Sequence, residues 1–200
     1  MNYNGPKVKI SRKLGVEVTP KSGKITAKKP YPPGQHGNTK RRPKQSDYGR
    51  QLLEKQRLRY QYSITEKQMR NYYKEATRIT GNTGDILVQL LESRLDALVY
   101  RSGLARTIYA ARQYVSHGHI LVNGKKVDIS SYNVKPNDEF EVKEKSRKLD
   151  CFQDAIRSAA SPDYIDLSKA EFKVKYLYIP PREEIPVVCE VPLVVEFYSR

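Results

Sequence analysis

The sequence contains little that could crosslink a fold or anchor it in a membrane. Its 200 residues include 2 Cys and no Trp, and only 38% are hydrophobic. Cys151 and Cys189 lie far apart, which predicts free thiols in a reducing compartment, with the cytoplasm as the default. No run approaches the roughly 18 apolar residues of a membrane span, and no apolar segment follows Met1 as in a signal peptide.

The sequence also lacks the patterns of common catalytic and metal sites. It has no Gly-rich phosphate loop and no spacing that suggests a nucleophile with its base. Residues 1–46 contain no Cys and one His, His36, so a four-ligand zinc site cannot be built there. His117 and His119 flank a glycine before a predicted strand and do not suggest a paired metal site. We therefore expect no metal, no cofactor and no enzymatic activity.

Positive charge is abundant and unevenly distributed. The chain has 37 Lys and Arg against 22 Asp and Glu, a net charge of +15. Residues 1–60 hold 16 Lys and Arg against 3 Asp and Glu, whereas residues 149–200 hold 6 against 9. Such an excess repels itself unless a polyanion neutralises it. The N-terminal part is therefore expected to bind phosphates, although a merely solvated basic tail is the alternative.

Residues 1–46 predict an extended basic arm. Pro30, Pro32, Pro33 and Pro43 exclude a continuous helix, and apolar residues are few. A segment that buries so little apolar surface should be poorly ordered alone in water and should become ordered on a partner.

Helical patterns begin at Asp47, a good N-cap, and again at Thr65, which forms a capping box with Gln68. Further helices are predicted from Asp85, from Ser93 to near Gly103, and from Thr107 to about Gly118. The helix after Thr65 has two faces of different character. Its apolar face carries Met69, Tyr72, Tyr73, Ala76 and Ile79, and its opposite face carries Lys67, Arg70, Lys74 and Arg78. This second face predicts phosphate contacts, with an ordinary soluble surface as the alternative.

After Gly118 the hydrophobic period changes from 3.6 to 2. Residues 120–122 and 125–127 flank Asn123-Gly124, a strong hairpin signal. Strands are also predicted around Phe140 and over 172–179, and a helix over 150–160. Residues 194–200 could form a strand or, with Pro192 in the first turn, a short helix. The fold class is therefore α+β: the basic arm, a small helical domain, and helices with a small, mainly antiparallel sheet.

The block 93–142 combines two short helices with the hairpin. Tyr109, Arg112, Gln113 and Ser116 share the polar face of the second helix. Cations suit phosphates, amides suit 2′-hydroxyls and base edges, and aromatic rings stack on unpaired bases, so this block predicts RNA binding. On these residues alone, an ordinary α+β surface remains the alternative.

Several segments resemble one known family. SRLDALVYRSG (93–103) and residues 105–142 are similar to the small RNA-binding domain named after small-subunit ribosomal protein four. GPKVKISRKLG (5–15), PGQHG (33–37), residues 45–62 and 70–85, and VVEFYSR (194–200) are similar to that ribosomal protein family itself, in its order. The resemblance covers nearly the whole chain, apart from 160–193, and the zinc-binding cysteine cluster of many members is missing.

The resemblance implies a structural protein of the small ribosomal subunit. Such proteins bind the 5′ domain of the rRNA, nucleate assembly of the subunit body and contribute to accurate translation. It implies an arm over 1–46, a helical domain over 46–92 plus 183–200, and an inserted RNA-binding domain over 93–182 with its core module at 93–155. It also implies contact with small-subunit protein five and other subunit proteins at Glu183, Glu184 and Tyr198, and proximity of the basic loop 40–44 to incoming mRNA.

The residues and the resemblance together mark the candidate RNA contacts. In the N-terminal half they are Lys7, Lys9, Arg12, Lys13, Lys40, Arg41, Arg42, Lys44, Tyr48, Arg50, Lys55, Arg57, Arg59, Lys67, Arg70, Lys74 and Arg78. In the block that resembles the RNA-binding domain they are Arg94, Arg101, Arg106, Tyr109, Arg112, Gln113, Ser116, His117, Asn123, Lys125 and Lys126.

Two other classes of protein could carry the same module. An RNA-modifying enzyme would need a large separate catalytic domain, for which about 100 residues outside the module leave no room. A ribosome-associated stress or quality-control factor would not require the N-terminal and C-terminal similarities. A DNA-binding protein is disfavoured because no recognition-helix pattern or dimer zipper is present.

Overall fold

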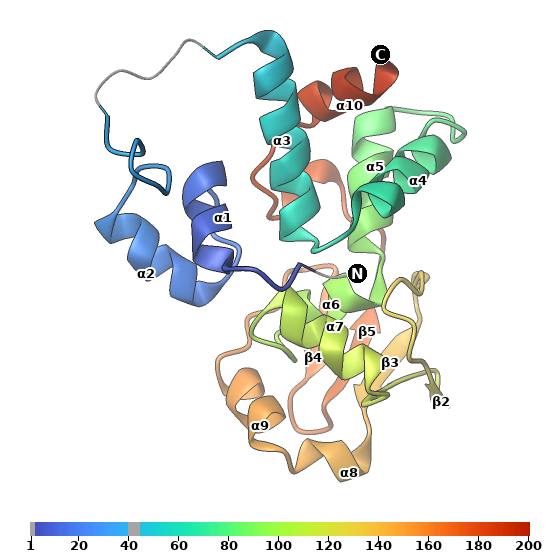
Figure 1. The fold of residues 1–200 in the computed structure, drawn as a ribbon. Coiled ribbons are helices and arrows are strands. Elements are labelled where there is room, and N and C mark those ends of the chain that lie inside the picture. Colours follow the sequence, from blue (N-terminus) through green and yellow to red (C-terminus); the bar gives the residue numbers. More distant parts are fainter. Residues whose placement is uncertain (1–2, 40–44) are drawn as a thin grey trace. The chain divides into compact units, whose positions relative to one another are not determined.

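The computed structural model describes residues 3–39 and 45–200 (Figure 1). The predicted contacts Lys40, Arg41, Arg42 and Lys44 lie outside the described residues. The fold is α+β, as predicted from the sequence, and its helices α1–α10 accompany one five-stranded sheet. None of the helices in the described ranges is both long and apolar enough to cross a bilayer.

The chain divides into two compact units. The first, called here the helical unit, combines the chain up to Leu87 with Pro186–Arg200. The second, called the sheet unit, is Val88–Ile185. The chain thus leaves the helical unit and returns to it at the C-terminus. The domain limits predicted from the sequence, after residues 92 and 182, stay predictions.

The first part of the helical unit contains regular structure that its composition did not predict. Helix α1 (Lys7–Leu14) and helix α2 (Pro20–Lys28) occupy the segment expected to be extended. The prolines 30, 32 and 33 all follow α2, so they restrict only the chain beyond it. Val16 and Val18 are buried between the two helices, and the Val18 amide donates a hydrogen bond to Ser11 Oγ (3.2 Å). The segment between the two helices is thereby joined to α1.

Three longer helices follow: α3 (Asp47–Gln61), α4 (Glu66–Ala76) and α5 (Thr83–Glu92). The N-cap of α3 is Ser46 rather than Asp47, because its hydroxyl accepts a hydrogen bond from the Gly49 amide (3.2 Å). The predicted capping box of α4 is confirmed: Thr65 N donates to Gln68 Oε1 (3.1 Å), and Gln68 N donates to Thr65 Oγ1 (3.3 Å). Helix α5 begins two residues before the expected Asp85.

The C-terminal segment forms helix α10 (Val191–Ser199), which resolves the ambiguity in the sequence. Pro192 lies in its first turn, where a missing amide hydrogen is tolerated. Helix α10 packs on α3, and Val194 is fully buried there. Gln51 Nε2 donates to Glu196 Oε2 (2.9 Å), so a polar contact also joins the two helices.

The sheet unit contains one antiparallel sheet with the strand order β2-β1-β3-β5-β4. The strands are β1 (Ile120–Val122), β2 (Lys125–Lys126), β3 (Glu139–Val142), β4 (Ile165–Ser168) and β5 (Lys173–Tyr176). The predicted hairpin is confirmed by the pairing of Val122 with Lys125. Asn123 (φ 47°) and Gly124 (φ 75°) both adopt the positive φ that this two-residue turn requires.

Helices cover the apolar face of this sheet. They are α6 (Leu95–Arg101), α7 (Ile108–Ser116) and α9 (Asp150–Arg157). The unit also contains the short α8 (Glu144–Arg147) and a 3-10 turn at Arg182–Glu184. The core joins α6, α7 and α9 to four of the strands, with Phe140 and Phe152 fully buried. The start of α7 is as predicted, since Thr107 Oγ1 accepts from the Ala110 amide (3.1 Å). This packing leaves Gln113 and Ser116 of α7 and the hairpin at the surface, whereas Arg112 is buried.

Candidate nucleic-acid interface

The four cations predicted on one face of α4 are all exposed. Lys67, Arg70 and Lys74 lie on the helix, and Arg78 follows just after its end. None of the four forms an ion pair with a carboxylate among the described residues. We call this row the α4 cation row. Spacings of three and four residues place its side chains next to one another, an arrangement that suits a chain of phosphates.

The opposite face of α4 packs as the sequence predicts, with one exception. Met69 and Ala76 are fully buried, whereas Ile79 is 45% exposed because the helix ends before it. The ring of Tyr73 stacks on that of Tyr198 in α10, with centroids 5.1 Å apart. Tyr198, proposed from the sequence as a contact for another protein, therefore helps to hold α10 on α4.

Glu66 at the start of α4 is a polar centre of the helical unit. It accepts hydrogen bonds from Lys55 Nζ (2.8 Å) and from Tyr198 Oη (2.8 Å). Burial opposes ionisation of Glu66, but these two bonds and the charges of Lys55 and Arg59 outweigh it, so its pKa lies below the ordinary value. Burial, followed by the bond to Glu66, raises the pKa of Tyr198. The carboxylate thus stays charged and the phenol stays neutral.

Several predicted contacts on α3 hold the fold instead of facing solvent. Lys55 is only 4% exposed, and its ammonium lies 4.7 Å from the Phe197 ring centroid. Arg57 donates to Leu14 O (2.8 Å) and pairs with Glu54. We therefore remove Lys55 and Arg57 from the proposed interface, because their charges are already neutralised inside the unit.

At the N-terminal end of α3, two predicted contacts remain accessible. Tyr48 is 52% exposed, although its ring lies 5.8 Å from that of Phe197. Arg50 is also exposed and pairs with Asp47 (2.6 Å), a surface contact of small energetic value. Both residues stay in the proposed interface.

Helix α1 contributes two exposed cations and two engaged ones. Lys9 and Lys13 are exposed. Lys7 is half-buried with its ammonium 5.6 Å from the Tyr3 ring centroid. Arg12 donates from Nε to the backbone oxygens of Lys29 (3.2 Å) and Tyr31 (3.1 Å), so it joins α1 to the segment after α2. Lys9 and Lys13 are the stronger candidates for phosphate contact.

In the sheet unit, two predicted arginines surround a buried aspartate. Arg94 is 1% exposed and donates to both oxygens of Asp96, at 2.9 and 2.6 Å. Arg112 on α7 lies 3.9 Å from the same carboxylate, and its side chain is 10% exposed. Asp96 thereby ties the start of α6 to α7. We remove Arg94 from the proposed interface, and we assign Arg112 mainly to the fold.

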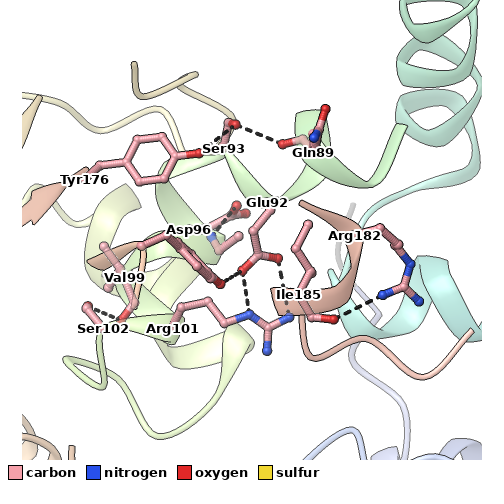
Figure 2. A network of polar contacts seen from close by, with 12 residues as sticks. Gln89, Glu92, Ser93, Asp96, Val99, Arg101, Ser102, Tyr176, Arg182 and Ile185 are labelled. Carbon is pink, nitrogen blue, oxygen red and sulfur yellow. Dashed lines mark hydrogen bonds and ion pairs between the residues drawn. The ribbon is translucent and has the colours of Figure 1, made fainter. Parts of the chain in front are cut away.

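Arg101 belongs to a second buried network, shown in Figure 2. Its Nε donates to Glu92 Oε1 (2.6 Å), and the Glu92 side chain is fully buried. Tyr164 Oη donates to the same oxygen (2.7 Å); burial, then the charge of Glu92, raises the pKa of this tyrosine. The neighbouring Ser93 hydroxyl lies 3.4 Å from the Tyr176 hydroxyl. These contacts link α5, α6 and the sheet, so Arg101 also leaves the proposed interface.

The remaining candidates of the sheet unit gather at the C-terminal end of α7 and at the hairpin. Gln113, Ser116, His117, Lys125 and Lys126 are exposed. The side chain of Lys126 lies directly over Gly118, at the end of α7. The helix end and the hairpin therefore form one surface, which we call the hairpin surface.

Three further candidates lie near this surface or at a distance from it. Asn123 is occupied by the turn itself: its Nδ2 donates to Asp138 (2.9 Å), and its Oδ1 accepts from the Glu139 amide (3.0 Å). Tyr109 on α7 is half-buried. Arg106 is 62% exposed and lies 3.4 Å from Asp154 on α9. Asn123 thus shapes the hairpin, and Tyr109 and Arg106 stay candidates.

Reasoning from the sequence missed an aromatic cluster at the end of α3. The Arg59 guanidinium lies 4.6 Å from the Tyr60 ring centroid, and the Tyr3 ring meets Tyr60 edge-on with centroids 5.6 Å apart. Interleaved cations and aromatics in RLRYQY (57–62) were the available signal. The role of Tyr3 depends on how residues before α1 pack, which no local pattern reveals.

The α4 cation row and the exposed lysines of the hairpin surface place this chain in the class of proteins that bind polyanions. Comparison with known proteins narrows this class. The family model for the ribosomal protein S4/S9 N-terminal domain matches residues 2–92, and that for the S4 domain matches residues 93–140.

Three relatives named small ribosomal subunit protein uS4 are similar over their full length. The protein of Streptomyces avermitilis is 49% identical, covering 100% of this chain and 99% of its own. Those of Chlorobaculum tepidum and Streptomyces griseus are 47% and 50% identical, with at least 98% of each chain covered. The chain belongs to the S4 family of small-subunit ribosomal proteins.

Proposed function

We propose that this chain is a structural component of the small ribosomal subunit that binds its ribosomal RNA. The observation that carries the proposal is the α4 cation row, four exposed cations without ion pairs in the described structure, in a chain of this family. Cations that are not neutralised within the protein contribute most to binding, because they neutralise phosphates and so release the counterions condensed on the RNA. The full-length similarity disfavours the alternative of a modifying enzyme or peripheral factor that shares only the module.

The proposed interface has two parts, one in each unit. In the helical unit it comprises the α4 cation row, Lys9, Lys13, Tyr48 and Arg50. In the sheet unit it comprises the hairpin surface with Tyr109 and Arg106. The basic residues 40–44 are proposed as contacts on charge alone. RNA is held by phosphate contacts, and the amides and rings reach unpaired bases.

A salt titration tests the proposal. The affinity of the purified chain for small-subunit rRNA should fall by roughly 0.7–0.9 log units per log unit of salt for each phosphate neutralised. Filter binding between about 50 and 200 mM salt measures this slope. An affinity that hardly changes would contradict the proposal. In parallel, the chain should stay with purified small subunits after a high-salt wash, whereas a peripheral factor would dissociate.

We further propose that the rRNA target lies in the 5′ domain and that binding nucleates assembly of the subunit body. Two things support this proposal: the family resemblance, and the presence of a part of the proposed RNA interface in each of the two units. A transcript of the 5′ domain alone should therefore bind the chain as tightly as the whole rRNA does. A much weaker affinity for that transcript would place the target elsewhere.

Two finer proposals concern translation itself. Glu183 and Glu184 are exposed, and they lie in a C-terminal segment where acidic residues outnumber basic ones. Such carboxylates suit contact with a protein, proposed as small-subunit protein five, better than contact with RNA. Charge reversal at both should raise miscoding in assembled subunits while rRNA binding persists. Normal accuracy in a reporter assay would overturn this role.

The other finer proposal concerns Lys40, Arg41, Arg42 and Lys44, which would grip phosphates of incoming mRNA without reading its sequence. Neutral replacements should slow translation of structured messages more than that of unstructured ones. Equal slowing of both kinds of message would argue against this contact.

We also propose that the chain has no catalytic role and that it is located in the cytoplasm, bound to the ribosome.

A further inference from the structure

A groove between α1 and α3 has the form of a small-ligand site. On α3, Leu52, Leu53, Gln56 and Tyr60 recur at helical spacing and so share one face. Helix α1 supplies the opposite wall through Ile10, Lys13 and Leu14. The cavity between them has a volume of about 320 Å³, and small-molecule sites begin at about 300 Å³. The groove is thus large enough for one planar ring system.

Two polar atoms in the groove-lining residues lack partners. Gln56 Oε1 and Arg59 Nε are buried, and neither has a hydrogen-bond partner among the described residues. A buried polar atom without a partner is costly, so a small shift of these two side chains that lets Gln56 Oε1 meet a donor and Arg59 Nε meet an acceptor would be stabilising. Gln56 and Arg59 are three residues apart on one helix, which makes their side chains neighbours. The groove is therefore suited to a ligand that has a hydrogen-bond donor next to a hydrogen-bond acceptor.

The rest of the lining suits a flat ring attached to an anion. None of the described residues that line the groove is acidic. Tyr60 provides an aromatic wall, and the Arg59 guanidinium covers its ring at 4.6 Å. Arg59 Nη1 lies 3.9 Å from Glu66, so this cation is only partly neutralised within the unit. Lys13 is exposed at the groove and can meet a phosphate. An aromatic ring, a guanidinium plane and a nearby cation are what an unstacked base with its phosphate requires.

We propose that the groove between α1 and α3 binds one unpaired nucleotide of the RNA, with adenine or cytosine as its base. Each of these bases has an amino group beside a ring nitrogen, so the amino group donates to Gln56 Oε1 while the ring nitrogen accepts from Arg59 Nε. Uracil has no amino group to donate. An apolar protein side chain in the same place would leave both polar atoms unpaired. This inference rests on the rRNA binding proposed above and adds a specific contact to it.

The variant Gln56→Leu tests the inference, because it removes the amide and keeps the approximate volume. The probe is purified small-subunit rRNA, footprinted with dimethyl sulfate, which reports on unpaired adenine and cytosine. Wild-type chain should protect one or a few such nucleotides that become reactive with Gln56→Leu, and affinity should fall about tenfold. The melting temperature should not fall, since the deleted oxygen has no partner in the free protein. A purely structural role would instead lower the melting temperature.

A matched control is Gln153→Leu in α9, whose amide donates to Arg147 O (2.8 Å). It should lower stability and leave the footprint unchanged. A second variant, Leu53→Trp, fills the groove and should expose the same nucleotides as Gln56→Leu. Footprints and affinities identical to wild type in both groove variants would overturn the inference. This result is expected if the groove stays empty or if a protein side chain, rather than a nucleotide, occupies it. Absence of rRNA binding by the wild-type chain would instead overturn the proposed function.

Discussion

The cations of the two units look alike in the sequence and differ in their surroundings. In the helical unit, the α4 cation row is exposed and has no ion pair among the described residues. In the sheet unit, the Arg94 side chain is 1% exposed and pairs with Asp96, and Arg101 pairs with the fully buried Glu92. Both groups were predicted to bind RNA. The structure gives them different roles: the first is available to a polyanion, and the second holds helices together.

The difference has a simple electrostatic origin. A charge removed from water must be neutralised by a partner in good geometry, and the pair then cannot be broken without a large loss of stability. An exposed cation has no such requirement, so its charge stays available for phosphates. Neutral replacements of the buried arginines Arg94 and Arg101 should therefore lower stability, whereas neutral replacements in the α4 cation row should lower affinity for RNA. Four experiments test this difference.

The largest expected effect is that of Arg94→Ala. This change removes the closest cation from the buried Asp96, which keeps the Ala97 amide (3.0 Å) and the more distant Arg112 (3.9 Å), so the free energy of unfolding should fall by about 3–5 kcal/mol. Urea denaturation measures the decrease. The matched control is Arg106→Ala, whose side chain is 62% exposed and whose replacement should stay within about 0.5 kcal/mol of wild type. Equal effects at the two positions would erase the distinction between the two kinds of arginine.

Replacing all four residues of the α4 cation row by Gln should act on affinity alone. Because the variant can no longer neutralise four of the phosphates, the slope of log affinity against log salt should become shallower by about 3. The same salt titration of rRNA binding measures it, and urea denaturation checks that stability is retained. A variant that unfolds more easily while its salt slope stays at the wild-type value would show that the row is structural.

Arg112→Ala should give an intermediate result. The side chain is 10% exposed and lies 3.9 Å from Asp96, so its removal should cost about 1–3 kcal/mol of stability. The sequence analysis places Arg112 among the candidate RNA contacts, which would instead mean weaker RNA binding without loss of stability. The melting temperature of the variant and the affinity of its folded fraction for rRNA distinguish a structural role of Arg112 from a direct RNA contact. Unchanged stability with weaker binding would return Arg112 to the interface.

The smallest effect concerns pH and the helical unit. Because the pKa of Glu66 is lowered in the folded chain, its contribution to stability is present above the unfolded pKa and is lost as the pH falls through the folded pKa. Glu66→Gln should remove this part of the acid sensitivity. Thermal unfolding of both proteins between neutral and acidic pH measures it. Parallel pH profiles would mean that Lys55 and Tyr198 do not stabilise the Glu66 carboxylate.

Local signals in the sequence were read correctly where the physics is local. The capping box of Thr65 and Gln68 involves residues three apart, and the Asn123-Gly124 turn requires only positive φ angles. For residues 194–200 the sequence allows either a strand or a helix, because a β-branched segment can form either element until it packs. Its packing on α3, more than a hundred residues earlier in the chain, decides for the helix.

The fold class, the family, the excess of positive charge and the helical face of Lys67, Arg70 and Lys74 all follow from the sequence. Composition and spacing are properties of the chain before it folds. Which cations are available to RNA depends on how the chain folds. Exposure depends on partners brought from elsewhere in the chain, as when Arg101 meets Glu92 and Tyr164, or Lys55 meets Glu66 and Phe197. A buried carboxylate neutralises a cation regardless of how basic its neighbours in the sequence are.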